Sequence, residues 1–455
     1  MFKRQNNIEN YLTIFGLIAY AVMLILAVYF YKERTILCDT STQLFEILNK
    51  HSFAIQVQRF GAAITQVFPL TASILGLSLK SVLIAYSVSY IIFYGSVFFI
   101  ILKVFKNINL AIVLLLFNTM MVRYSFYWVQ CEFVQGVVFT LLFLAITEYA
   151  LSQAHTPNWY YPSFVFCIIT IIYFYPLLVF VIAFALLYDM ILNPQRRKKI
   201  GIILVIFLIS FYVKNTYFSN WYDATKFEST HGILSKIPHM FYLTSFKQLF
   251  LFFKNEYYPS LLFLLGLTTY FIVAKKYIQL LIMWTFFIGV FVLILLTYPD
   301  GFVQFYIESQ LLILSIFVAI PFAYQVVNSK IKLAIPFAIF LLFTVRVIHV
   351  SNDFTNRLHY LRNVLANTSP KVIIPIEKLD MNIMKYTWGL AYEGWLLSTL
   401  ESGKTQSVVC EETPNQFRNF QNDKMIFLTN TQNKPYQEIK NLYFQKDTTH
   451  VYQLK

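Results

Sequence analysis

The sequence predicts a polytopic α-helical membrane protein with about 11 transmembrane helices and a small C-terminal domain of α/β or α+β type. Composition is the first reason: 58% of the 455 residues are hydrophobic, 13% are charged and the mean hydropathy is +0.59, which excludes an ordinary soluble protein. The second reason is that eleven apolar stretches divide the first 350 residues. The third is a change of composition, since 22 of the last 105 residues are charged, against 36 of the 350 before them.

Each apolar stretch is close to the length that crosses the roughly 30 Å hydrocarbon layer as a helix, and a helix satisfies its own backbone hydrogen bonds there. The stretches lie near residues 11–31, 81–102, 108–122, 133–151, 160–174, 176–192, 200–217, 258–274, 279–298, 309–327 and 333–350. Pro176 leaves two alternatives open, which are a tight turn between two short spans and a kink within one long helix.

The basic loops predict the orientation, because Lys and Arg accumulate on the cytoplasmic side of membrane proteins. When the N-terminus is placed inside, the cytoplasmic side receives the basic residues at 3–4, 103–106, 196–199, 275–276 and 330–332. The net charge of +14 fits these loops and their contact with anionic membrane lipids. No basic stretch interleaved with aromatic residues indicates a nucleic-acid partner.

This orientation gives the domain plan. We expect an integral protein of the cytoplasmic (inner) membrane with its N-terminus in the cytoplasm and a transmembrane domain over residues 1–350. Long outer loops are expected at 32–80 and 218–257, and an extracytoplasmic soluble domain over 351–455. Within that domain, four short β-rich runs and one helical stretch near 382–401 predict a mixed fold; the runs are 371–375, 406–409, 425–428 and 450–454. The four cysteines are too few for a disulfide framework, and buried free thiols are favoured over a single bridge.

Asp39 is the first candidate catalytic residue. It follows the first apolar stretch at the start of a long outer loop, whose Leu44, Phe45, Ile47 and Leu48 predict amphipathic helices in the plane of the membrane interface. A carboxylate beside the membrane face at the start of a large loop is where a polytopic enzyme would hold a catalytic base. The alternative is that Asp39 is the N-cap of a helix over residues 40–49, and the two roles are compatible.

A very short outer turn between the third and fourth apolar stretches holds a second group of candidates. Glu132 is a second candidate catalytic acid, and Arg123 and Gln130 are candidate substrate-binding residues. Ionisable groups at a membrane edge are costly unless they are used or paired. A structural ion pair between Arg123 and Glu132 is the alternative, and it is slightly favoured.

Further candidate substrate-binding residues lie in the outer loops. Arg59 sits within the apolar part of the first loop, where it could pair with a phosphate group or extend to lipid headgroups. The late outer loop adds further candidates, and these are Asp300, Gln304, Tyr306 and Glu308. No Gly-rich phosphate loop and no metal-ligand spacing is present, so no cofactor is predicted.

The layout resembles the GT-C superfamily of integral-membrane glycosyltransferases. The likeness rests on the acid in Cys38-Asp39-Thr40 soon after the first span, the in-plane helices, the second large outer loop, the C-terminal outer domain, and the segment from Phe302 to Gln310 that leads into a late helix. It implies transfer of a sugar from a polyprenyl-phosphate donor to a glycan, lipid or protein acceptor, with inversion at the anomeric carbon. Many members carry two adjacent acids where this chain has Asp39-Thr40, so dependence on a divalent metal is left open.

The sequence leaves three other functions open. A surface-polysaccharide polymerase or ligase shares the lipid-linked substrate and the outer location. A polytopic transporter or flippase is disfavoured, because the apolar stretches are nearly free of charge and the polar residues gather at the outer surface. A non-enzymatic assembly protein leaves the acids of the outer loops unexplained.

Overall fold

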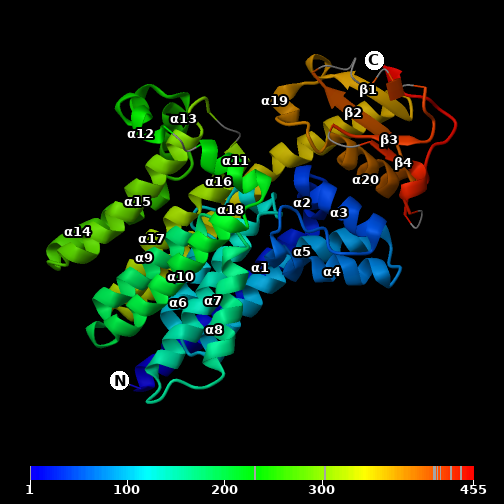
Figure 1. The fold of residues 1–455 in the computed structure, drawn as a ribbon. Helices are drawn as coiled ribbons and strands as arrows, with labels where there is room; N and C mark the ends of the chain where they lie inside the picture. Colours follow the sequence, from blue (N-terminus) through cyan, green and yellow to red (C-terminus); the bar gives the residue numbers. More distant parts are fainter. Residues whose placement is uncertain are drawn as a thin grey trace.

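The computed structural model describes residues 2–229, 232–301, 304–412, 417, 419–420, 422–430, 433–440 and 443–455. The helices of the N-terminal part are, in chain order, α1 (Phe2–Tyr29), α2 (Tyr31–Thr35), α3 (Cys38–Lys50), α4 (Ala63–Ile74), α5 (Leu79–Phe99), α6 (Ile108–Phe117), α7 (Glu132–Ser152), α8 (Tyr160–Ile172), α9 (Leu178–Leu192), α10 (Arg197–Tyr217), α11 (Trp221–Ser229), α12 (Ile233–Lys236), α13 (Thr244–Asn255), α14 (Tyr258–Val273), α15 (Tyr277–Thr297), α16 (Gln304–Leu311), α17 (Ile313–Gln325) and α18 (Ser329–Ala366). Figure 1 shows them as a helical domain, with the C-terminal module at one end.

The protein is a helical membrane protein. Among the described residues, seven helices are long and apolar enough to cross a membrane. The pair α13 and α14 is bent by 82°, and the number is eight if this pair counts as one broken span. The stretches near 108–122, 160–174 and 176–192 form the shorter apolar helices α6, α8 and α9. Length and composition alone therefore support fewer than the eleven spans expected from the sequence.

Pro176 marks a break between two helices. α8 ends at Ile172 and α9 begins at Leu178, and the residues between them form turns. The residue before a proline avoids the helical conformation, and proline itself cannot donate the next helical hydrogen bond. Of the two alternatives, the turn between short helices is the one that forms.

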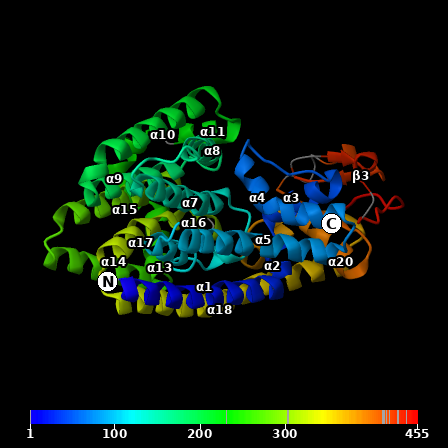
Figure 2. The same ribbon diagram turned by 90° about the horizontal axis from the view of Figure 1, so that it is seen from below.

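A single helix connects the helical domain to the C-terminal module. The 38-residue α18 runs beside α1 along the edge of the domain (Figure 2) and continues without a break through residue 350. The domain boundary expected at 350/351 therefore falls inside a continuous helix, because the helix keeps its hydrogen bonds where the composition becomes polar. The first strand of the module begins at Lys371.

The module is built on a small parallel sheet. Its elements are β1 (Lys371–Pro375), α19 (Met381–Met384), α20 (Leu390–Ser402), β2 (Ser407–Glu411), β3 (Ile426–Leu428), β4 (Asn433–Pro435) and β5 (Gln453–Leu454). The strand order β2-β1-β5 is parallel throughout, so β1, α20 and β2 make a β-α-β crossover, and β3 pairs with β4 in an antiparallel ribbon. Both β1 and β2 are mostly buried, which explains why each reads as a continuous apolar run.

Helix α3 is packed against the module. The Phe45 ring lies 5.1 Å from Tyr392 and 5.4 Å from Phe427, centroid to centroid, and the Glu46 carboxylate pairs with Lys434. The apolar face that the sequence places in the membrane interface therefore contacts protein. Apolar side chains remain exposed instead around the next turn and α4, and these are Phe60, Val67, Phe68 and Ile74.

Candidate functional site

A cavity of about 590 Å³ lies where the first loop, the segment before α7, α11, α16 and the C-terminal module meet. Five residues predicted from the sequence line it, and these are Asp39, Arg59, Gln130, Glu132 and Tyr306. The sequence missed other lining residues, including Trp128, Trp221, Tyr222 and Trp388. Residues far apart in the chain thus form one polar and aromatic chamber.

Asp39 occupies the first turn of α3 and reaches the cavity. Helix α3 begins at Cys38, and Leu37, which has no cap-forming side chain, is its N-cap residue. The expectation that Asp39 is the N-cap is therefore wrong. Its Oδ1 atom instead accepts a hydrogen bond from the indole Nε1–H of Trp388 at 3.1 Å.

The environment of Asp39 makes its carboxyl group easier to protonate than an exposed one. Burial raises the pKa of the carboxyl to about 6; the Trp388 hydrogen bond opposes this, while the negative charges of Glu132 and Glu393 add to it. Among the described residues no cation pairs with Asp39 within ion-pair distance. A carboxyl group with a pKa near neutrality exchanges a proton readily at physiological pH.

The C-terminal module fixes the start of α3. The backbone N–H of Cys38 donates to Glu393 Oε1 at 2.7 Å, and the other oxygen of Glu393 pairs with Arg357 Nη1 at 2.6 Å. A Cβ atom added to Gly389 would lie 2.6 Å from the Cys38 Cα atom, so only glycine permits this approach. The position of Asp39 thus depends on contacts with α18 and the module.

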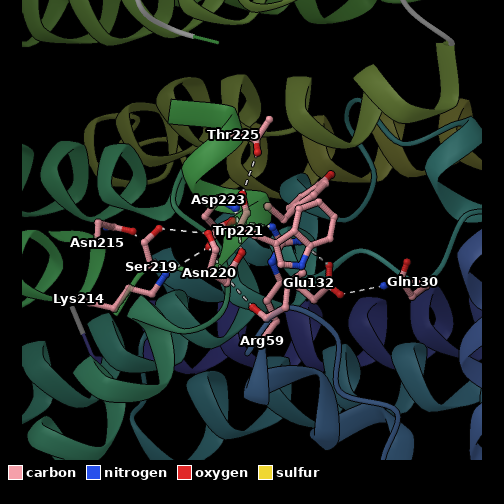
Figure 3. A network of polar contacts seen from close by, with 12 residues as sticks. Arg59, Gln130, Glu132, Lys214, Asn215, Ser219, Asn220, Trp221, Asp223 and Thr225 are labelled. Carbon is pink, nitrogen blue, oxygen red and sulfur yellow. Dashed lines mark hydrogen bonds and ion pairs between the residues drawn. The ribbon is translucent and has the colours of Figure 1, made fainter. Parts of the chain in front are cut away.

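A buried network of four charges begins in the cavity lining, at Arg59 and Glu132, and continues behind it to Asp223 and Lys214 (Figure 3). Arg59 pairs with Glu132 at 3.2 Å and with Asp223 at 3.0 Å, and Lys214 pairs with Asp223 at 3.2 Å. Gln130 donates to the second oxygen of Glu132 at 2.8 Å. With two cations and two carboxylates, the network carries no net charge.

Opposite charges favour the ionised forms of Asp223 and Arg59. Burial raises the pKa of Asp223, but the charges of Arg59 and Lys214, together with hydrogen bonds from Arg59 and Asn220, outweigh this effect, so the net direction is downward. Burial lowers the pKa of Arg59, and Glu132, Tyr175 and Asp223 together outweigh it, so the net direction is upward. Removing one member of such a buried pair leaves an uncompensated charge and costs about 3–5 kcal/mol.

Local sequence explains how Asp223 is positioned. Asn220 caps α11, its Oδ1 atom accepting the Asp223 backbone N–H at 2.8 Å, and its Nδ2 atom donates back to Asp223 Oδ2 at 2.8 Å. An N-cap residue followed three positions later by an acid is a helix-start pattern, and it is the signal that could have identified Asp223. Asn220 also donates to the carbonyl of Val57, a β-branched residue held at φ +43°, an uncommon and strained conformation beside the cavity.

Aromatic rings and hydroxyls form another part of the lining, and the Tyr222 ring lies 5.2 Å from Arg59 Cζ. The Tyr306 hydroxyl lies 3.3 Å from that of Tyr222 and 3.4 Å from that of Tyr298, and Gln310 Nε2 donates to Tyr298 at 2.8 Å. The Tyr306 ring also lies 5.4 Å from Trp128, centroid to centroid. Flat aromatic faces and hydroxyl groups side by side suit the alternating apolar and polar faces of a sugar ring.

A second, apolar cavity of about 300 Å³ adjoins the first. The two share Tyr175 and Gln310, and the second continues between α9, α10 and α15, where its lining includes Phe180, Phe211 and Leu293. All three helices are apolar enough for a membrane environment. A polar chamber thus opens beside an apolar one within the helical domain.

Arg123 and Glu308 belong to a separate cluster outside the cavity lining. Arg123 pairs with Glu256 at 2.5 Å, so the expected pair between Arg123 and Glu132 is wrong. Glu308 accepts the backbone N–H groups of Arg123 at 2.7 Å and Ser125 at 2.8 Å. This cluster fixes the segment that carries Trp128 and Gln130, because it ties that segment to α16.

The two remaining predicted residues do not line the chamber. Asp300 is exposed in the turn after α15 and is not among the lining residues. The side chain of Gln304 lies outside the described part of the structure. Within the described residues, no group of three or more His, Cys, Asp or Glu side chains is arranged to hold a metal ion, and the four cysteines are buried free thiols.

Comparison with protein-family models, curated proteins and solved structures finds no match to this chain.

Proposed function

We propose that the protein is a membrane glycosyltransferase of GT-C type that moves a sugar from a polyprenyl-phosphate donor to an envelope glycan, lipid or protein acceptor. One observation carries the proposal: the polar chamber contains a carboxylate, Asp39, that has no ion-pair partner in the described part of the chain, and it lies beside an apolar cavity between helices. An amphiphilic substrate fits this pair of cavities, since its sugar phosphate enters the first and the start of its lipid tail the second. Ligand sites usually combine such an apolar lining with a few convergent polar groups.

In the proposed reaction, Asp39 is the general base. The carboxylate takes the proton of the acceptor hydroxyl while the acceptor oxygen forms a bond to the anomeric carbon of the sugar. The bond from that carbon to the phosphate oxygen breaks, and the lipid phosphate leaves with the electron pair. A pKa of about 6 for Asp39 fits this role, because the group is mostly ionised at neutral pH and still accepts a proton readily.

Trp388 and Arg59 are assigned supporting roles. The indole N–H of Trp388 holds one oxygen of Asp39 and leaves the other for the acceptor. Arg59 brings a positive charge to the lining, where its Nη1 and Nη2 atoms pair with Glu132 and Asp223. In the proposal this charge stabilises the phosphate at a distance, and the two carboxylates hold the guanidinium in place.

The proposal includes the membrane topology. We propose eleven spans, which are the seven long helices, α14 from the bent pair, and the three short helices α6, α8 and α9. This number places the N-terminus inside and the C-terminal module outside. α6 has ten residues and reaches about 15 Å, half of the hydrocarbon layer. It is buried by neighbouring helices, so the irregular segment that follows it meets protein and the water-filled chamber instead of lipid.

The test measures the envelope glycoconjugates of a strain that lacks the gene, by mass spectrometry. The strain is complemented with the unaltered protein, with Asp39→Asn or with Glu377→Gln, each at the same level in the membrane. Glu377 is an exposed acid of the C-terminal module and serves as the control. We expect deletion to remove a sugar-sized mass that the unaltered protein and Glu377→Gln restore and that Asp39→Asn does not. Equal rescue by Asp39→Asn would refute Asp39 as the base, and an unchanged profile on deletion would refute glycosyl transfer.

A further inference from the structure

A second polar cavity of about 590 Å³ lies at the other end of the helical domain. It is lined by Ile8 near the N-terminus, by the segment between α5 and α6, and by the starts of α10 and α18. The N-terminus is at the end away from the C-terminal module (Figure 1). This cavity is therefore remote from the chamber around Asp39, and the proposed function does not use it.

Three cations from three different elements line this cavity. Lys106 precedes α6, Arg196 precedes α10, and Lys332 lies in the first turn of α18. Among the described residues, no carboxylate lies within ion-pair distance of any of them, and Lys332 Nζ donates only to the neutral Asn109 Oδ1 at 2.9 Å. The lining thus gathers positive charge that the protein does not neutralise by pairing.

The one carboxylate in the lining is already occupied. Glu148 accepts a hydrogen bond from the Tyr324 hydroxyl at one oxygen and from Asn107 Nδ2 at 2.8 Å at the other. Both donors are neutral, and both hold the Glu148 carboxylate in place. The three cations therefore exceed the acid by two charges.

Helix ends add to the positive potential. The cavity receives the N-terminal ends of α6, α10 and α18, through Asn107, Arg196 and Ser329. A helix N-terminus carries a partial positive charge, so basic residues at this end are unfavourable unless an anion is present. Asn107 and Asn328 already cap N–H groups of α6 and α18, so these ends contribute mainly their partial charge. In addition, Lys106 is held at φ +52°, an uncommon conformation for a residue with a side chain. Three helix ends, three cations and a strained loop converge on one space.

We infer that this cavity binds a phosphate group, the anionic group that both an anionic phospholipid headgroup and a free phosphate present. Phosphate suits the site because it accepts hydrogen bonds from ammonium, guanidinium and backbone N–H groups at once. The surroundings favour the lipid source: Val327, which lines the cavity, is 88% exposed, as expected where acyl chains cover the surface. Basic pockets at helix ends are known to hold anionic lipid headgroups.

The experiment is native mass spectrometry of the full-length protein, released from detergent and titrated with phosphatidylglycerol or phosphatidylcholine. The variants are Lys106→Ala/Lys332→Ala and, as a matched control, Lys330→Ala, an exposed lysine that is two residues away on α18 and does not line the cavity. We expect a phosphatidylglycerol adduct that forms about tenfold less readily in the double variant. The control should bind like the unaltered protein, and phosphatidylcholine should bind weakly to all three. Equal melting temperatures show that the variants are folded.

A second arm separates the sources of phosphate. Inorganic phosphate and glycerol phosphate are added as competitors during the phosphatidylglycerol titration. Resistance of the adduct to millimolar competitor supports a lipid headgroup, and displacement together with a direct phosphate adduct supports a soluble ligand at the same site. Equal phosphatidylglycerol binding by the unaltered protein and the double variant, with no phosphate adduct, would overturn the inference. This outcome is independent of sugar transfer, because no residue of the Asp39 chamber is changed.

Discussion

Replacing Asp39 by Asn is expected to stabilise the folded protein at neutral pH while removing its activity. The pKa of Asp39 is raised from 3.8 to about 6 in the folded state, chiefly by burial, so holding the ionised form there costs free energy. A shift of about two units corresponds to roughly 3 kcal/mol at most. Part of the side chain still reaches cavity water, and an amide oxygen can still accept the Trp388 indole N–H, so we expect a gain of about 1–2 kcal/mol.

The pH dependence distinguishes this effect from a general change in packing. Because the folded-state pKa is above the unfolded value, the folded state binds more protons between pH 4 and 6, and the contribution of this group to stability is lost as the pH rises through that window. The advantage of Asp39→Asn should therefore be complete above about pH 7 and should disappear towards pH 4.

The assay is thermal unfolding of the detergent-solubilised protein, followed by intrinsic fluorescence at pH 7.5 and pH 4.5 with one scan rate throughout. Glu377→Gln, an exposed acid, is the control and should show no pH-dependent difference from the unaltered protein. If Asp39 mainly serves the helix dipole at the start of α3, the variant would be less stable at pH 7.5. That result, or the same gain at both pH values, would refute the reasoning.

Three further predictions follow from the same site. Sugar transfer should fall about tenfold between pH 7 and pH 5 as Asp39 is protonated, which a pH–rate profile of isolated membranes would measure; a flat profile contradicts it. Gly389→Ala should destabilise the fold by about 1–3 kcal/mol and reduce glycan rescue, because its Cβ atom would lie 2.6 Å from the Cys38 Cα atom; unchanged unfolding and rescue contradict it. Asn220→Ala should cost about 1 kcal/mol by removing the cap of α11, whereas Asn220→Ser should retain most of the stability; equal unfolding of both variants contradicts it.

The helical membrane architecture could be predicted because it depends on local composition. An apolar run long enough to cross a bilayer has few stable conformations other than a helix, so each of the eleven stretches contains a helix. The ends were harder to predict: α6 ends at Phe117, although the apolar stretch continues to residue 122, and α18 continues past residue 350 although its composition changes. Composition locates an element, while backbone hydrogen bonding and tertiary contacts determine where it ends.

The sequence predicted only some of the residues that form the site. Asp39, Arg59 and Glu132 could be found because each is an ionisable residue close to an apolar stretch at the predicted outer face of the membrane. Trp388 could not, because it lies 349 residues from its partner Asp39 in a segment with no motif of its own. The partner of Arg123 was also wrong: sequence proximity suggested Glu132, but the folded chain brings Glu256 closer.

The charge arrangement distinguishes the two candidate catalytic acids. Glu132 is bound at both oxygens, by Arg59 at 3.2 Å and by Gln130 at 2.8 Å, so taking a proton would break a buried ion pair. Asp39 has one oxygen bound by an indole and no cationic partner among the described residues. Glu132→Gln is therefore expected to lower the stability of the protein and Asp39→Asn to raise it, although both would reduce transfer. Opposite shifts of the melting temperature in the two variants would assign proton transfer to Asp39 and positioning of Arg59 to Glu132, and shifts in the same direction would refute this division of roles.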